Sequence, residues 1–232
     1  MTMEDAIKRL KRLDACAVSD AMDKLGLSGA VSGLEQRAGT GRIAGRVMTY
    51  RLVEHGQRPA TAGPARHLGT TAIERAQPGD VLVAEQRTGI DAGSWGGILT
   101  LGAKLRGIAG VIAEGLVRDL DEAVAYDFPV FSRGATARTA RGRVVEADTG
   151  EPVTVGDVRV CAGDYVIADR SGVVFIPAAD IDRVLDAAET VFAREAAMAK
   201  ALLGGTPISE VMGANYENML QPLADAAGRG TE

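Results

Sequence analysis

An arginine and an aspartate follow a short apolar run near the middle of the chain. Residues 110–113 are short and β-branched enough to form a buried strand, which brings Arg118 and Asp119 to its end. Arg118 can bind a carboxylate through two parallel hydrogen bonds, and Asp119 can hold a hard divalent cation through oxygen. The pattern alone is equally compatible with a solvated ion pair, or with Asp119 as a helix N-cap.

A glycine-led segment lies about twenty residues before this pair, where a loop gives way to a predicted helix. At the start of a helix the backbone N–H groups have no partner within the helix, so they can bind a carboxylate or phosphate. Glycines there leave the backbone open to a ligand. The residues predicted to form this anion site are Gly96, Gly97, Ile98 and Leu99.

Other catalytic chemistries have little support. The two histidines, His55 and His67, have no carboxylate or cysteine at ligand spacing, so we interpret both as structural. Cys16 and Cys161 form no metal-binding or redox motif and are predicted to be reduced thiols. No serine lies in a G-x-S-x-G turn, and Lys104 is a weak candidate for a Schiff-base lysine.

The elements that would position these residues form a predicted β-α-β unit. A strand is predicted over residues 81–84, a helix from 96 to about 106 and a second strand over 110–113, with Gly107 ending the helix. Strands joined in this way pair in parallel, so an α/β fold is expected. Another strand is predicted over residues 45–53.

Helices are predicted at both ends of this core. The first should end near Asp14, and a second should run over residues 19–25 with Ser19 as its N-cap. A long amphipathic helix is predicted over 178–203. We interpret residues 1–232 as one domain, with N-terminal helices at 1–26, an α/β core at 45–177, and the long helix and a tail at the C-terminus.

The composition limits the classes of function. A net charge of −5 argues against a general nucleic-acid binder, because binding to phosphate backbones requires clustered Lys and Arg. The N-terminus begins acidic and then becomes amphipathic, unlike a secretory leader or a membrane span. We therefore expect a cytoplasmic protein that makes no membrane contact and acts on a small molecule.

Several of these segments together resemble the RraA-like family, which includes 4-hydroxy-4-methyl-2-oxoglutarate aldolases. The resemblance covers about residues 46–205. The segments that carry it are 95–99, 103–107, 110–119, 163–169 and 171–174. The resemblance implies a β/β/α fold of the swivelling type. It also implies assembly into trimers or hexamers with active sites between subunits.

The same resemblance implies a metal-dependent lyase that releases pyruvate from a 4-hydroxy-2-oxo acid or decarboxylates oxaloacetate. Arg118 would bind the 2-oxo acid, and Asp119 would hold Mg²⁺ or Mn²⁺. The backbone of residues 96–99 would hold the pyruvyl carboxylate. Glu195 would reach the site of a neighbouring subunit.

The chain departs from the family pattern at two positions. Relatives that cleave branched diacids often carry an acidic residue where this chain has Gly97, which bears on the substrate. Similar enzymes usually carry an arginine four residues after the glutamate that matches Glu195, where this chain has Ala199. The alternative from another class is a regulator without catalytic activity that binds a ribonuclease or another protein partner, because the family also includes ribonuclease inhibitors. Such regulators need not keep the metal aspartate, whereas this chain does.

Overall fold

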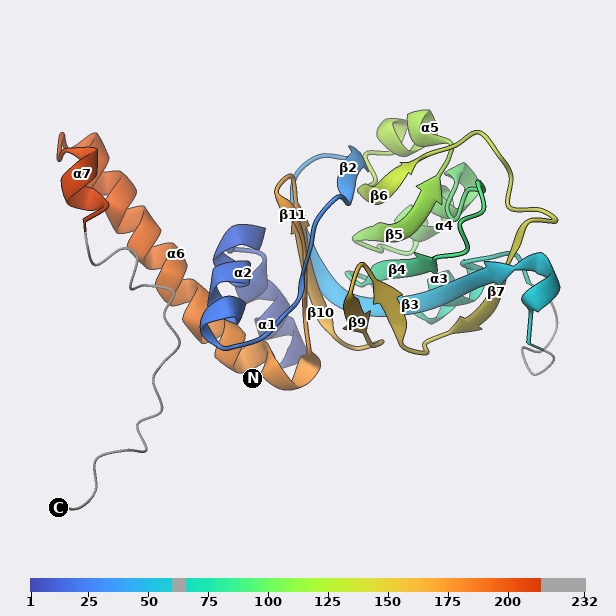
Figure 1. The fold of residues 1–232 in the computed structure, drawn as a ribbon, viewed down its shortest axis with the longest axis horizontal. Coiled ribbons are helices and arrows are strands. Elements are labelled where there is room, and N and C mark those ends of the chain that lie inside the picture. The colour runs from blue at the N-terminus through green and yellow to red at the C-terminus, as the bar shows by residue number, and fades with distance from the viewer. Residues whose placement is uncertain (60–65, 214–232) are drawn as a thin grey trace, which may run out of the picture.

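The computed structural model describes residues 1–59 and 66–213, so the end of the predicted tail lies outside the described residues. The chain folds as an α/β structure around one large mixed sheet (Figure 1). The helices are α1 Met3–Leu10, α2 Ala15–Lys24, α3 Thr70–Arg75, α4 Gly97–Leu105, α5 Leu120–Ala125, α6 Ile181–Leu203 and α7 Ile208–Val211. Single 3₁₀ turns occupy His55–Gln57 and Ala178–Asp180.

Four parallel strands, β3–β4–β5–β6, form the centre of the sheet, and antiparallel strands extend it on both sides. Their order is β1-β11-β10-β3-β4-β5-β6-β2, with β7 paired to β3 and β8–β9 as a separate hairpin. The strands are β1 Ala30–Val31, β2 Glu35–Ala38, β3 Ile43–Glu54, β4 Val81–Gln86, β5 Gly110–Val117, β6 Val130–Ala135, β7 Val144–Thr149, β8 Val153–Val155, β9 Val158–Val160, β10 Tyr165–Asp169 and β11 Gly172–Ile176.

The predicted β-α-β unit is confirmed. Strands β4 and β5 pair in parallel with Val81 opposite Gly110, and α4 connects them. Gly107 ends the connection in a left-handed conformation with φ 73°, as expected of a glycine that stops a helix. The buried, β-branched strands β4 and β5 explain why the parallel sheet forms here, since helices and the β8–β9 hairpin cover its two faces.

The N-terminal helices differ from the prediction in their boundaries. Helix α1 ends at Leu10, earlier than expected. Helix α2 begins at Ala15 because the Asp14 side chain accepts a hydrogen bond from the N–H of Ala17, so Asp14 is the N-cap and Ser19 lies inside the helix. Gly26 follows α2 with φ 67°.

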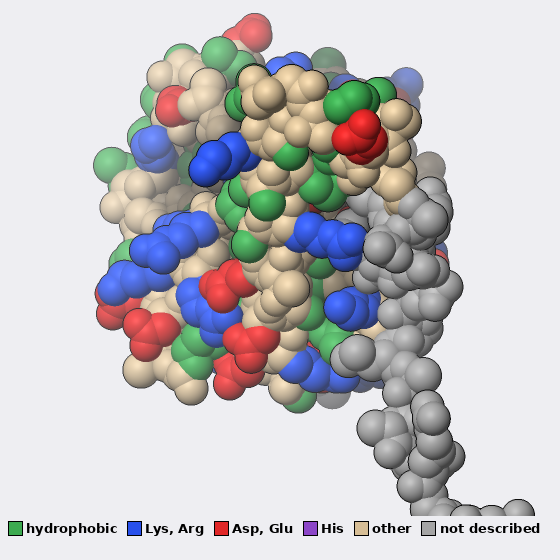
Figure 2. Space-filling model, turned by 90° about the vertical axis from the view of Figure 1, so that its left-hand side faces the viewer, with side chains coloured by type: hydrophobic (Ala, Val, Ile, Leu, Met, Phe, Trp, Pro, Cys, Tyr) green, Lys and Arg blue, Asp and Glu red, His purple; other side chains and the backbone are tan. Residues whose placement is uncertain are grey.

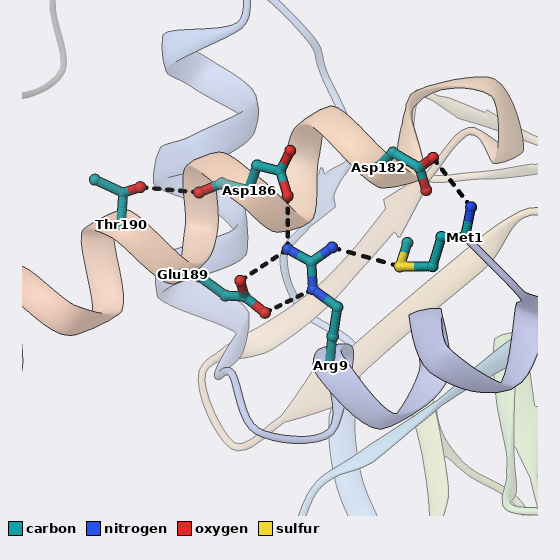
Figure 3. Close-up of polar contacts among 6 residues, drawn as sticks. All are labelled: Met1, Arg9, Asp182, Asp186, Glu189 and Thr190. Carbon is teal, nitrogen blue, oxygen red and sulfur yellow. Dashed lines mark hydrogen bonds and ion pairs between the residues drawn. The ribbon is translucent and has the colours of Figure 1, made fainter.

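Helices α1, α2 and α6 pack as a separate layer over the β10–β11 end of the sheet (Figure 1). Arg9 fastens α1 to α6, since its guanidinium binds both carboxylate oxygens of Glu189 at 2.7 Å and Asp186 at 2.6 Å (Figure 3). The raised pKa of Arg9 is caused by these hydrogen bonds. Helix α6 keeps one buried face only as far as Val191, and its last turns and α7 extend away from the body (Figure 1).

The end of the molecule formed by α6 and its neighbours has a mixed surface, with basic, acidic and apolar side chains next to one another (Figure 2). The apolar side chains exposed on α6 and just beyond it include Leu203, which is 91% exposed, and Phe192, Leu202 and Ile208. In the described part of the chain, every helix is too short or too polar to span a membrane.

Candidate functional site

The loop before α4 is fastened to the end of β5. Gly93 forms a parallel bridge with Leu116, whose carbonyl accepts hydrogen bonds from both the N–H and the hydroxyl of Ser94. The N–H of Arg118 in turn donates to the carbonyl of Trp95 at 3.0 Å. The two segments singled out in the sequence, residues 96–99 and the Arg118–Asp119 pair, therefore lie side by side.

Trp95 anchors this junction in the core. Its ring is 2% exposed and stacks on Phe128 with the ring centroids 6.2 Å apart. The indole N–H donates to the Thr100 hydroxyl at 2.8 Å, and that hydroxyl donates to the carbonyl of Gly96. A buried indole whose N–H is satisfied in this way fixes the position at which α4 begins.

Asp119 has an unusual backbone conformation, which turns its side chain toward α4. Its φ of 58° and ψ of 43° are left-handed, which costs a residue other than glycine on the order of 1 kcal/mol. Asp119 precedes α5, but its side chain makes no capping bond to that helix. Its carboxylate instead accepts the N–H of Gly97 and the Nε–H of Arg118, both at 3.0 Å.

These contacts keep the Asp119 carboxylate ionised. Partial burial alone would raise its pKa, but the hydrogen bond from Gly97 and the contacts with Arg118 outweigh burial and lower the pKa below its ordinary value. The N-terminal end of α4 also carries a partial positive charge that favours an anion here. A partly exposed, ionised carboxylate is a form that a hard divalent cation can bind.

Glycine at both positions where α4 begins leaves room for two neighbouring carboxylates. A Cβ on Gly96 would lie 2.7 Å from Asp119 Oδ2, and one on Gly97 would lie 2.8 Å from Glu122 Oε2. Both distances are shorter than real Cβ contacts, so a side chain would displace a carboxylate. The Glu122 carboxylate therefore lies in the space that a side chain at position 97 would enter.

The first turn of α4 keeps donors available for a ligand. Among the described residues, the N–H groups of Ile98 and Leu99 have no protein acceptor. Arg118 uses its Nε–H for Asp119, which leaves its two terminal nitrogens for a second anion. Together these groups can bind a carboxylate beside the Asp119 oxygens.

A cavity of about 340 Å³ opens over these groups. Its lining includes Gly96, Gly97, Ile98, Leu99, Arg118 and Asp119, so all but one of the site residues predicted from the sequence come together in one cavity. A second hollow of about 410 Å³ lies on the α5 side of Asp119 and includes Glu122.

The cavity also includes three polar residues that the sequence did not indicate as functional, His67, Thr139 and Arg141. His67 precedes α3, and the other two come from the loop between β6 and β7. No spacing links these segments to the Arg118–Asp119 pair, so only the folded chain brings them together. His67, which the sequence led us to interpret as structural, has an exposed side chain that lines the cavity.

The residues present fit a hard cation held by few protein ligands. Among the residues described, no three His, Cys, Asp or Glu side chains cluster as a metal cage. Asp119 and Glu122 both lie against Gly97, since a Cβ at that glycine would be 3.3 Å from Asp119 Cβ and 2.8 Å from Glu122 Oε2. Mg²⁺ favours one or two protein carboxylates, with water and substrate oxygens completing its coordination.

Glu195 does not line this cavity within a single chain. It lies on the extended part of α6, and its pKa is raised by partial burial and by Asp14 and Asp20. Any contribution of Glu195 to the site would have to come from a second copy of the chain. That role stays a prediction.

Residues 15–175 match the RraA-like family, described as Aldolase/RraA, and this chain belongs to that family. A Halalkalibacterium halodurans protein provisionally named as a 4-hydroxy-4-methyl-2-oxoglutarate aldolase is 27% identical, over 85% of this chain and 89% of its own length. Protein DlpA of Legionella pneumophila is 25% identical over 90% of this chain. The chain spans only 33% of the length of that larger protein.

Solved structures share the fold. An uncharacterized protein from Pseudomonas syringae is 24% identical with a TM-score of 0.80, over 90% of this chain and 98% of its own. RraAS2 of Streptomyces coelicolor, described as an unusual member of the RNase ES inhibitor RraA protein family, is 25% identical with a TM-score of 0.70, over 80% of this chain and 91% of its own. The α/β fold expected from the family resemblance is thus confirmed.

Proposed function

We propose that this chain is a divalent-metal-dependent lyase acting on small 2-oxo acids. It would release pyruvate from a 4-hydroxy-2-oxo acid by retro-aldol cleavage, or decarboxylate oxaloacetate. The observation that carries the proposal is the Asp119 carboxylate, which is ionised and held between the Gly97 N–H and Arg118 at 3.0 Å from each. The aldolase names within the family support the same reaction class.

Each part of the site has a role in this reaction. The N–H groups of Ile98 and Leu99 and the terminal nitrogens of Arg118 would bind the substrate carboxylate and orient its 2-oxo group toward Asp119. Asp119 and Glu122 would hold Mg²⁺ or Mn²⁺, which when bound supplies Lewis-acid polarisation of the 2-oxo oxygen.

Arg118 would act as negative charge develops on the 2-oxo group of the substrate. As the bond between C3 and C4 breaks, its electron pair moves onto the 2-oxo group and creates an enolate, whose oxygen the guanidinium stabilises. In retro-aldol cleavage the C4 hydroxyl gives its proton to a water molecule and becomes the carbonyl of the departing fragment, whereas in decarboxylation CO₂ leaves. Protonation of the enolate at C3 then gives pyruvate in both cases, so one site can support both reactions.

The decisive experiment is a pyruvate-release assay over a panel of 2-oxo acids, with and without Mg²⁺. We expect oxaloacetate decarboxylation above the rate of Mg²⁺ alone, abolished by EDTA and restored by added Mg²⁺ or Mn²⁺. Activity that survives thorough chelation would remove the metal from the mechanism. No pyruvate from any member of the panel would favour the regulator described next.

A regulator without catalytic activity is the second candidate, because RraAS2 and the Thermus RNA-processing inhibitor RraA share this fold, the latter at a TM-score of 0.54. Such a protein would bind a ribonuclease or another protein partner and would not need the Asp119 carboxylate. Co-purification with a ribonuclease that is unaffected by Asp119→Asn, together with absent lyase activity, would support this candidate.

We also propose a homo-oligomer, a trimer or hexamer, in which Glu195 reaches the site of a neighbouring subunit, and a cytoplasmic location. The extended part of α6 supports assembly, since its exposed Phe192, Leu202 and Leu203 form apolar surface of the kind that interfaces bury. The sharpest test of this assembly is to mix subunits of two inactive variants. Arg118→Ala and Glu195→Gln subunits, each inactive alone, should regain activity when refolded together, and an active monomer in light scattering would contradict the assembly.

A further inference from the structure

The aliphatic stem of Arg118 lies in a slot between two glycines. A Cβ on Gly93 would lie 3.0 Å from both Cγ and Cδ of Arg118, and one on Gly96 would lie 3.4 Å from its Cγ. Contacts of this length are tighter than most Cβ atoms make, so the stem fits because neither residue has a side chain. The backbone on each side of the stem therefore limits where the guanidinium can point.

The direction of this guanidinium matters for the proposed reaction. Its Nε–H donates to Asp119 at 3.0 Å, and its terminal nitrogens are the proposed donors to the substrate. Displacement of a catalytic group by about 1 Å can lower a rate by about 100-fold. The Arg118 side chain is 35% exposed, so burial alone does not hold it. The contacts along its stem must therefore supply part of the constraint.

The Gly93 wall of the slot is itself fixed. Its N–H donates to the carbonyl of Arg138 at 3.0 Å, and it forms the parallel bridge with Leu116 at the end of β5. The next residue, Ser94, is 0% exposed and bonds the same Leu116 carbonyl. Gly93 is thus tied on one side to β5 and on the other to the long connection between β6 and β7 (Figure 1).

Asp91 closes a hydrogen-bond network between these two segments. Its carboxylate accepts a hydrogen bond from the Thr136 hydroxyl at 2.5 Å and pairs with the Arg138 guanidinium at 3.2 Å. The Thr136 hydroxyl oxygen accepts the N–H of Arg138 at 3.1 Å. The N–H of Thr136 donates at 2.9 Å to the carbonyl of Val117, the residue before Arg118. The network therefore holds the Arg138 carbonyl where it can bind Gly93.

The hydroxyl of Thr136 should contribute more to this network than the ion pair does. The side chains of Arg138 and Asp91 are 63% and 50% exposed, and ion pairs between exposed side chains contribute little. Thr136 is only partly exposed, and its bond to a carboxylate is assisted by charge. Removing that hydroxyl is therefore the mildest way to loosen the network.

We propose that Gly93, held by the hydrogen bond from Thr136 to Asp91, positions the Arg118 guanidinium for its anionic ligand. This role rests on the proposed function, which assigns Arg118 to the substrate, and adds the means by which the arginine is held. Gly93 and Asp91 offer no side chain to the substrate or the metal, so they act through Arg118. Disturbing them should therefore change anion binding only while Arg118 is present.

Oxalate is the probe for this role, because it is a planar dianion with the shape of the pyruvate enolate. Its affinity is measured by calorimetry in saturating Mn²⁺, and kcat/KM for oxaloacetate is measured alongside. Gly93→Ala places a methyl group against the Arg118 stem, and Gly93 does not have a left-handed φ, so alanine brings no backbone strain. We expect both quantities to fall by about 10- to 100-fold. Mn²⁺ affinity without oxalate should stay near that of the wild type.

The decisive comparison repeats Gly93→Ala in Arg118→Ala protein. Once the stem is gone, the added methyl group meets only the Arg138 carbonyl, at 3.4 Å. Gly93→Ala should then cause no further loss of oxalate affinity, because a residue that acts through Arg118 loses its effect when Arg118 is removed. Gly102→Ala is the matched control, since its methyl group meets nothing within 4 Å and should leave oxalate affinity unchanged in both backgrounds.

A second pair of variants tests the network without adding bulk. Thr136→Val keeps nearly the same shape and removes the hydroxyl that binds Asp91. We expect it to lower oxalate affinity by about 3- to 10-fold, the scale of one lost hydrogen bond. Thr136→Ser keeps the hydroxyl and should restore most of the affinity. This pair decides the role even if Gly93→Ala folds poorly.

Equal losses of oxalate affinity with and without Arg118 would show that Gly93→Ala disturbs the whole site, and would overturn the positioning role. Unchanged affinity in both Gly93→Ala and Thr136→Val would overturn it as well. Wild-type protein that binds oxalate but releases no pyruvate overturns the lyase alone, because the oxalate comparison still decides how Arg118 is held. Wild-type protein that neither binds oxalate nor releases pyruvate overturns both.

Discussion

The Asp119 carboxylate accepts a hydrogen bond from the backbone N–H of Gly97, 22 residues earlier in the chain, at 3.0 Å. This contact joins the end of β5 to the start of α4 and so couples the proposed metal ligand to the proposed carboxylate site. The left-handed backbone of Asp119 allows it, since the side chain turns away from α5, which it would otherwise cap. Backbone strain at this position is consistent with a functional constraint.

Asp119→Asn should weaken metal binding while preserving the fold. The amide oxygen can still accept the Gly97 N–H, but the negative charge that attracts a divalent cation is lost. We expect kcat/KM to fall by about 100-fold or more, with partial recovery in excess Mg²⁺. Titration with Mn²⁺ followed by electron paramagnetic resonance measures the loss of affinity directly. Asp157→Asn, an exposed aspartate outside the cavity, is the matched control.

Arg118→Ala should fail differently, because the metal ligand remains. We expect Mn²⁺ affinity to change little and kcat/KM to fall by about 100-fold or more, the scale of losing one donor to a developing oxyanion. Thermal melts provide the check on structure. Strong destabilisation with near-normal turnover in the folded fraction would mean that Arg118 and Asp119 are a structural ion pair.

Local patterns were sufficient to predict the centre of the fold and the two candidate segments at its edge. Short β-branched runs and helix-stopping glycines predicted β4, α4 and β5, and the two segments that they position do meet. The predicted start of α2 was wrong, because Asp14 and Ser19 are both good N-caps. The choice between them depends on burial of Ala17 and Val18, which are 0% exposed.

Two further residues near the Arg118–Asp119 pair could not be predicted from the sequence. Glu122 looks like an ordinary acidic residue in the first turn of a helix, and Arg141 like a solvated loop arginine. Glu122 lines the hollow on the α5 side of Asp119, and Arg141 lines the cavity over α4. Both positions depend on how α5 and the β6–β7 loop cross the edge of the sheet, which no local spacing encodes. The left-handed conformation of Asp119 is likewise a consequence of tertiary contacts, chiefly with Gly97.

Arg9→Met should loosen the α1–α6 contact in a pH-dependent way. The Arg9 hydrogen bond lowers the pKa of Glu189, so this interaction stabilises the protein fully above the unfolded-state pKa of about 4.3. The contribution is lost as pH falls through the lowered pKa. Because Glu189 is 45% exposed, we expect only about 1 kcal/mol at pH 7.

Urea unfolding of Arg9→Met at pH 7 and below pH 4 measures this effect. The difference from wild type should shrink at the lower pH and also in high salt, which screens exposed charges. Lys11→Met, which removes an exposed lysine next to α1, should show no comparable pH dependence. A gap for Arg9→Met that persists unchanged below pH 4 would mean that the arginine stem, and not its charge, fastens α1 to α6.

Two glycines in the same helix give a matched pair of alanine variants that separates helix stability from site geometry. A Cβ on Gly102 meets nothing within 4 Å, so Gly102→Ala should stabilise the protein by about 0.5–1 kcal/mol through helix propensity and leave activity unchanged. At Gly97 the same methyl group would lie 2.8 Å from Glu122 Oε2 and 3.3 Å from Asp119 Cβ. Gly97→Ala should therefore displace the Glu122 carboxylate and lower Mn²⁺ affinity and kcat/KM together, even if the melting temperature rises. Normal metal affinity and turnover in Gly97→Ala would show that Glu122 is free to move without consequence, and its proposed role beside the metal would be wrong.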